Sequence, residues 1–179
     1  PPLRVRVQML EEGVQIIKSM WTSSPANFAG KHYQISDVSC EPLPNPVPPI
    51  MIGGSGERYT LKAVAKYADW WNDLNRPPDQ LRHKLSVLKS HCDDLGRNYD
   101  EIRKTLAVRV FIEPSHKIAV QRAAEYEGIS VSGDHVSIIE QFDAIADLGF
   151  DLCILNFPTH FQSMNDVRIF MDKVMPAFQ

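Results

Sequence analysis

The chain has 179 residues, of which 44% are hydrophobic and 23% are charged, and its net charge is −3 at pH 7. This length suffices for one domain with a substantial core, and the composition is that of an ordinary globular protein. No basic run would follow a phosphate backbone, and no apolar run approaches the roughly 20 residues of a membrane helix. We therefore expect neither nucleic-acid binding nor a membrane partner.

Three cysteines, Cys40, Cys92 and Cys153, are scattered along the chain without the spacing of metal ligands. This pattern predicts reduced thiols in a cytoplasmic protein and no metal site. The first residues are Pro1-Pro2, and they lack the apolar segment of a signal peptide. A helical pattern follows almost at once, which is typical of a chain cut within a domain.

The first predicted element is an amphipathic helix over residues 3–21. Its apolar residues recur at spacings of three and four: Val7, Leu10, Val14, Ile17 and Trp21. Residues 22–47 form a proline-rich insertion, because four prolines between Glu41 and Pro48 exclude a helix. Within this insertion, residues 31–38 partly alternate and predict a short strand.

Four apolar segments then predict strands, over residues 50–52, 69–72, 105–112 and 152–157. A helical pattern follows each strand. One more helix opens at Ser132-Gly133-Asp134, and Asn165 is the predicted cap of the last helix. Apolar strands that alternate with helices indicate an α/β fold with a parallel sheet. Four such units fit a small open sheet or half of an eight-stranded barrel.

The first predicted strand runs directly into Gly53-Gly54-Ser55-Gly56, with Thr60 at the start of the following helix. Ligands of parallel α/β folds bind at the carboxyl ends of strands, and glycines let the backbone approach a ligand closely. Unpaired amides at the helix start favour a phosphate. The spacing matches neither a Walker loop nor the dinucleotide pattern GxGxxG. A tight turn without a ligand therefore remains open beside a phosphate cradle.

Polar residues also occur at the ends of two other predicted strands. Asn72 ends the second strand and Asn156 lies near the end of the fourth, so both are candidates for contact with a substrate; loop capping is the alternative. His32 and His160 are weaker candidates of the same kind. We assign no catalytic residue.

Three stretches of the sequence resemble the luciferase-like superfamily of flavin- and deazaflavin-dependent oxidoreductases. The run PPIMIGGSGERYTLKAVAKYADWWN has the apolar strand, the Gly-Gly pair and the Ala68-Asp69 pair of that superfamily. The stretch RVRVQMLEEGVQIIKSMW, followed by FAGKHYQI, resembles its mid-barrel helix and insertion. The stretch LRHKLSVLKSHCDDLGRNYDEIRKT, with Gly96-Arg97, resembles the branch that uses the deazaflavin coenzyme F-420.

The resemblance implies a (β/α)8 TIM barrel, of which residues 1–179 form a single domain carrying the last four βα units, a preceding helix and the insertion. It further implies an oxidoreductase that moves a hydride between coenzyme F-420 and a small organic substrate, with the cofactor phosphate held at Gly53, Gly54, Ser55, Gly56 and Thr60. Because the first four strands would carry most ring contacts, the chain alone is expected to be incomplete for catalysis. The alternatives are an FMN-dependent monooxygenase and a non-catalytic half-barrel module. Unpaired sheet edges favour a homo-oligomer.

Overall fold

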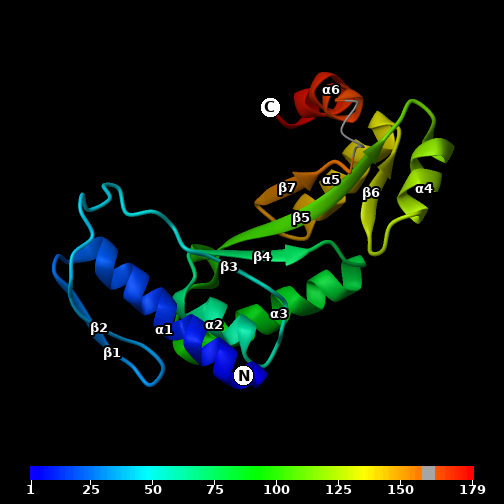
Figure 1. Ribbon diagram of the computed structural model, residues 1–179. Coiled ribbons are helices and arrows are strands. Elements are labelled where there is room, and N and C mark those ends of the chain that lie inside the picture. Colours follow the sequence, from blue (N-terminus) through cyan, green and yellow to red (C-terminus); the bar gives the residue numbers. More distant parts are fainter. Residues whose placement is uncertain (159–163) are drawn as a thin grey trace. The chain divides into compact units, whose positions relative to one another are not determined.

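The structure, a computed structural model, describes residues 1–158 and 164–179 (Figure 1). Its chain divides into two compact units. The first comprises Pro1–Trp71 and Ser86–Ile102, and the second comprises Asn72–Leu85 and Arg103–Gln179. Strand β4 (Trp70–Leu74) and helix α3 (Pro78–Leu95) contribute residues to both units. None of the helices in the described ranges combines the length and apolar composition needed to cross a bilayer.

The first unit contains one long helix, a hairpin, a short strand and a short helix, together with a 3-10 turn: α1 (Leu3–Thr22), β1 (Ala26–Ala29), β2 (Gln34–Val38), β3 (Met51–Gly53), α2 (Thr60–Tyr67) and η1 (Tyr99–Glu101). Helix α1 confirms the predicted helix and packs against β1 and α2 (Figure 1). Strands β1 and β2 pair in antiparallel fashion. The predicted strand within residues 31–38 corresponds to β2. Strand β1 escapes sequence prediction because it has four residues, three of which are Ala or Asn with low strand propensity.

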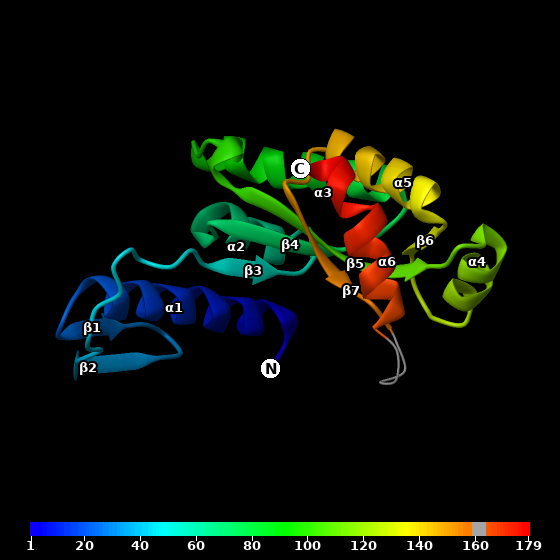
Figure 2. The same cartoon turned by 90° about the horizontal axis from the view of Figure 1, so that it is seen from above.

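The second unit alternates strands and helices: β5 (Arg103–Ile112), α4 (His116–Ala124), β6 (Ser130–Gly133), α5 (His135–Asp147), β7 (Leu152–Asn156), α6 (Asn165–Lys173) and the 3-10 helix η2 (Met175–Phe178). Strand β5 pairs in parallel with both β6 and β7. Helices α4 and α5 pack against β6, and α6 packs against β5 and α5 (Figure 2). Alternate residues of β5 are buried in the core of this unit, namely Leu106, Val108, Val110 and Ile112.

The four predicted strands are all present, and β6 is an additional one. Hydrogen bonds link β3, β4, β5 and β6 in that order, and β7 also pairs with β5. The sequence predicts a helix start at Ser132-Gly133-Asp134, but the structure has strand β6 up to Gly133, with helix α5 following. A strand with a single large apolar residue, Val131, gives no hydrophobic pattern, and pairing with β5 stabilises it instead.

The starts of α5 and α6 differ in how they are capped. Asp134 caps α5, because its Oδ1 accepts a hydrogen bond from the amide of Ser137 at 3.0 Å. The predicted cap at Asn165 is wrong, since α6 begins at this residue and Met164 occupies the cap position without a side-chain hydrogen bond. The next residue, Asp166, fixes this helix start through an ion pair with Arg122 at 3.1 Å.

Candidate functional site

The glycine corner, residues 53–56, joins β3 to α2 in the first unit. Gly53 is the last residue of β3, and α2 begins at Thr60. Gly54 has a φ of 122°, a conformation that residues with a side chain rarely adopt. Gly53, Gly54 and Gly56 are exposed and Ser55 is half-buried. The residues proposed for cofactor binding thus form one accessible turn at the carboxyl end of a strand.

The side chain of Thr60 lies against two of these glycines. A Cβ atom added at Gly56 would lie 2.9 Å from Thr60 Oγ1, and one added at Gly54 would lie 3.2 Å from Thr60 Cγ2. The amide of Leu61 donates to the carbonyl of Gly56 at 2.9 Å, which ties the turn to the start of α2. The structure therefore brings Gly54, Gly56 and Thr60 together, and a side chain at Gly56 would displace the Thr60 hydroxyl.

Trp71 of β4 holds the corner from the buried side. Its indole Nε1 donates to the carbonyl of Gly54 at 2.9 Å, and the residue is 0% exposed. In a trans peptide the C=O and the following N–H point in opposite directions. The Ser55 N–H consequently points away from the Trp71 ring. Trp71 thus packs in the core, and no local sequence pattern indicates its hydrogen bond to Gly54.

His91 of α3 fixes the other end of the corner. Its Nε2 lies 2.8 Å from the carbonyl oxygen of Glu57, so the tautomer protonated at Nε2 donates to that oxygen. Side chains from β4 and α3 therefore fix the backbone at Gly54 within the corner and at Glu57 directly after it. Such a fixed backbone is suited to binding a ligand without losing much entropy on binding.

Two residues of the motifs that resemble the luciferase-like superfamily have structural roles around this corner. Asp69 Oδ2 accepts a hydrogen bond from the amide of Ile50 at 2.8 Å, directly before β3. Arg97 donates to three carbonyls at the end of α2, those of Val64 at 3.4 Å, Ala65 at 3.0 Å and Ala68 at 2.7 Å. These contacts fix the strand before the corner and the helix after it.

The two asparagines predicted to face a substrate are not brought together. Asn72 is the third residue of β4, and its Oδ1 accepts a hydrogen bond from Thr105 Oγ1 at 2.9 Å. Asn156 is the last residue of β7 and is level with Arg109 of β5. Thr105 and Arg109 are four residues apart on one strand, which corresponds to about 13 Å.

Asn156 does line a pocket of about 170 Å³ in the second unit. Arg109 lines the same pocket and is absent from the sequence-based candidates. The sequence feature that could have indicated Arg109 is its position as the single charged residue in the largely apolar segment TLAVRVFI. Strand alternation places Arg109 on the face opposite to Val108 and Val110, which are buried.

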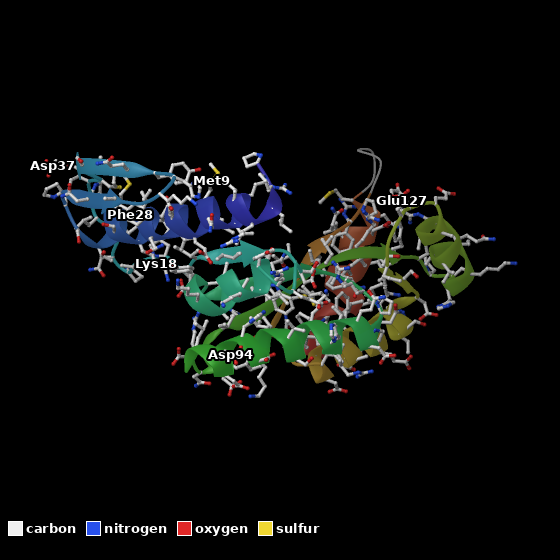
Figure 3. The ribbon with its side chains drawn as sticks, turned by 90° about the horizontal axis from the view of Figure 1, so that it is seen from below. Met9, Lys18, Phe28, Asp37, Asp94 and Glu127 are labelled. Atoms are coloured by element: carbon white, nitrogen blue, oxygen red, sulfur yellow. The ribbon has the colours of Figure 1, made fainter. Side chains whose placement is uncertain are left out.

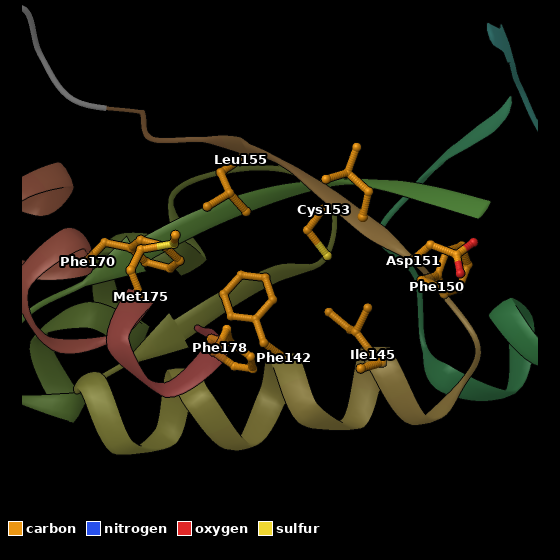
Figure 4. Close-up of a pocket in the computed structure, with 11 residues that line it drawn as sticks. Phe142, Ile145, Phe150, Asp151, Cys153, Leu155, Phe170, Met175 and Phe178 are labelled. Atoms are coloured by element: carbon orange, nitrogen blue, oxygen red, sulfur yellow. The ribbon is translucent and has the colours of Figure 1, made fainter. Parts of the chain in front are cut away.

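A larger cavity of about 350 Å³ lies between α5, β7 and the α6–η2 segment (Figure 4). Phe142 and Ile145 enter it from α5, and Cys153 and Leu155 enter it from β7. Burial raises the pKa of the Cys153 thiol to about 11, so the thiol is protonated at neutral pH. This cavity contains none of the predicted site residues, and its lining is that of a core.

Within residues 1–158 and 164–179, the histidines show no arrangement that binds a metal. His32 Nε2 lies 3.3 Å from Gln8 Oε1 in the first unit, and His116 Nδ1 lies 3.1 Å from Ser137 Oγ in the second. No group of three His, Cys, Asp or Glu residues within residues 1–158 and 164–179 is placed to hold a metal ion. His160 lies outside the described residues.

Comparison with known proteins identifies a matching family model and similar curated proteins. A family model described as luciferase-like monooxygenase matches residues 2–143. An F420-dependent glucose-6-phosphate dehydrogenase from Microbacterium testaceum is 22% identical over 100% of this chain and 63% of its own length. A second dehydrogenase of that name, from Amycolatopsis mediterranei, is 23% identical over 82% of this chain and 45% of its own. The chain thus spans less than two thirds of these relatives.

Solved structures confirm the barrel-type fold. An F420-dependent secondary alcohol dehydrogenase in complex with an F420-acetone adduct superposes with a TM-score of 0.84 at 16% identity, covering 100% of this chain and 64% of its own. A riboflavin lyase with modified FMN superposes with a TM-score of 0.81 at 12% identity, covering 98% of this chain and 57% of its own. The fold is therefore that of part of a luciferase-like barrel.

Proposed function

The chain belongs to the luciferase-like monooxygenase family, and from this premise we propose that the protein transfers a hydride between coenzyme F-420 and a small organic substrate. The observation that carries the proposal is the glycine corner. It is an exposed turn with a positive φ at Gly54, and the buried Trp71 fixes its backbone through a hydrogen bond to the Gly54 carbonyl. The F420-dependent names of several relatives support this choice of cofactor.

The residues of the corner fit an anionic cofactor tail. The Ser55 amide points away from the Trp71 ring, and the Thr60 hydroxyl lies beside Gly56. The positive end of the α2 dipole lies on the same side. In this proposal Gly53, Gly54, Ser55, Gly56 and Thr60 hold the phosphate. When the cofactor is bound, its deazaflavin ring would exchange the hydride with the substrate, and the protein would orient that ring.

FMN is the second candidate cofactor. It is favoured by the similarity to the riboflavin lyase, whose structure contains modified FMN. The two cofactors have distinct absorbance spectra, so the spectrum of the cofactor that the protein retains or takes up identifies the correct one. Binding of neither cofactor would favour the non-catalytic half-barrel module.

The test of the corner is the substitution Gly54→Val. Valine at a φ of 122° is strained, and its branched side chain would press on Thr60 Cγ2, which lies 3.2 Å from the position of a Cβ atom. We expect at least about tenfold weaker binding of F-420, measured by fluorescence titration, because the amides that hold the phosphate shift.

Gly96→Val is the matched control. Gly96 also has a positive φ, 64°, but it ends α3 and no atom lies within 4 Å of an added Cβ. Both variants should lose stability through backbone strain, and only Gly54→Val should lose cofactor affinity. Equal F-420 affinity in the two variants would exclude the corner as the phosphate site.

The location and assembly of the protein are also proposals. We expect a cytoplasmic protein, since none of the three cysteines, Cys40, Cys92 and Cys153, forms a disulfide. We further expect a homo-oligomer. Light scattering coupled to size-exclusion chromatography measures the mass directly, and a monomer at micromolar concentration would contradict this expectation.

A further inference from the structure

The geometry points to an oxyanion-recognising subsite at Arg109 and Asn156, which would bind the carboxylate or phosphate of the substrate. The inference rests on the proposed function, because it assigns a substrate class to an enzyme of that kind. The pocket concerned lies in the second unit and is lined by Leu74, Ala107, Ile129 and other residues of β4, β5 and the segment before β6.

Strand register places the two polar residues side by side. Arg109 is the register partner of Asn156, the last residue of β7, and also of Ser130, the first residue of β6. Side chains of register partners on neighbouring parallel strands project to the same face of a sheet. The guanidinium and the carboxamide therefore line the pocket together, where β7 ends and β6 begins.

The Arg109 side chain is held in place before any ligand binds. Its Nη1 donates to the carbonyl of Glu127 at 2.7 Å, and its Cζ lies 5.5 Å from the centre of the Tyr126 ring. A guanidinium has five N–H donors in a planar fork that matches carboxylate and phosphate oxygens. The hydrogen bond to Glu127 leaves donors for a second acceptor, and the fixed position lowers the entropy cost of binding it.

The size and lining of the pocket define what enters it. A volume of about 170 Å³ is smaller than a typical complete ligand site, so it accommodates one end of a substrate. Leu74 and Ile129 are exposed by 63% and 49% and offer an apolar wall for a short hydrocarbon portion next to the charged group.

Glu127 also lines the pocket and is exposed, and Figure 3 shows it between α4 and β6. Its carboxylate opposes an anion, whereas its main-chain carbonyl positions Arg109. Glu127→Gln keeps that carbonyl and removes the negative charge. We expect this variant to bind inorganic phosphate about threefold more tightly than the wild type.

The decisive experiment titrates the protein with inorganic phosphate and, separately, with acetate. The signal is the Arg109 Nε–Hε resonance, assigned by its loss in Arg109→Lys. Both anions should shift this resonance saturably in the wild type. The tighter anion identifies the substrate group as a phosphate ester or a carboxylate. Arg109→Gln should weaken the tighter anion at least about tenfold in calorimetry.

Arg103→Gln is the matched control, because Arg103 is exposed and begins the same strand. It should bind the anion like the wild type. Gly54→Val should also leave the Arg109 resonance responsive, which separates this subsite from phosphate bound at the glycine corner. An Arg109 resonance that neither anion moves would overturn the inference, even if Arg109→Gln did not fold.

Binding of F-420 to the same samples distinguishes a failure of the subsite from a failure of the proposed function. Cofactor binding without any anion response at Arg109 would reject the subsite and leave the proposed function standing. An anion response without binding of F-420 or FMN would reject the proposed function and leave an oxyanion site at Arg109.

Discussion

Single side chains fix the backbone around the glycine corner, and each forms hydrogen bonds with main-chain atoms. Trp71 bonds the carbonyl of Gly54, Asp69 bonds the amide of Ile50, and Arg97 bonds carbonyls at the end of α2. Carbonyls at the end of a helix have no partner within the helix. The carbonyl of Val64 also accepts from the amide of Ala68, but the guanidinium gives those of Ala65 and Ala68 a partner, and desolvating them without one would carry a cost.

Arg97→Met should destabilise the protein through loss of these hydrogen bonds. The side chain of Arg97 is 21% exposed, and methionine preserves much of its apolar volume without donors. We expect the free energy of unfolding, from urea denaturation, to fall by about 1–3 kcal/mol. Arg82→Met serves as the control, because Arg82 lies on α3 with 61% of its side chain exposed and should change stability little. An equal loss in both variants would show that Arg97 does not cap α2.

At the level of elements, the hairpin of β1 and β2 is attached to α1 by one carboxylate. Glu12 accepts hydrogen bonds from three consecutive amides, those of Lys31 at 2.9 Å, His32 at 2.8 Å and Tyr33 at 2.9 Å. A Cβ atom on Gly30 would collide with this carboxylate and with the ring of Phe28, which is labelled in Figure 3. Glycine at position 30 thus allows the Glu12 carboxylate to approach the turn closely, and a larger residue would displace it.

The attachment should depend on pH. Desolvation acts to raise the pKa of Glu12, but the hydrogen bonds from His32, Tyr33 and Lys31 lower it below the ordinary value of 4.5. A lowered carboxyl pKa means that the contribution to stability is complete above pH 4.5 and is lost as the pH falls through the lower, folded-state pKa. We expect the amides of residues 34–38 to exchange faster with solvent in that acidic range.

Glu12→Gln should produce the same effect at neutral pH, with exchange of these amides accelerated by about tenfold, because a neutral amide is a weaker acceptor than a carboxylate. Glu11→Gln, one position earlier on α1, should leave the exchange rates unchanged. Hydrogen exchange followed by NMR gives the rates residue by residue. Slow exchange that persists in Glu12→Gln would show that strand pairing alone holds the hairpin.

For the whole molecule, cofactor binding and stability are linked. A ligand that binds only the folded state at 100 times its dissociation constant stabilises a protein by about 2.7 kcal/mol. For a chain of this size, we expect saturating F-420 to raise the Tm by roughly 5–10 °C in differential scanning fluorimetry. At the same F-420 concentration, the shift should fall to about half or less in Gly54→Val, because binding is at least about tenfold weaker, and it should persist in Gly96→Val. A wild-type Tm that F-420 leaves unchanged would contradict cofactor binding by this chain.

The sequence by itself determined the order of helices and strands, the α/β class and the position of the glycine corner. Hydrophobic periodicity and glycine placement are local signals, and they predicted α1, α3 and β5 well. Strand β6 depended on the tertiary structure, because pairing with β5 stabilises a segment with little apolar character of its own. The same holds for the contacts of Trp71 with Gly54 and of Glu12 with residues 31–33. These contacts link residues that are 17 or more positions apart in the sequence, and such residues become neighbours only when the chain folds. For the same reason, no local sequence pattern indicates that Arg109 and Asn156 line one pocket.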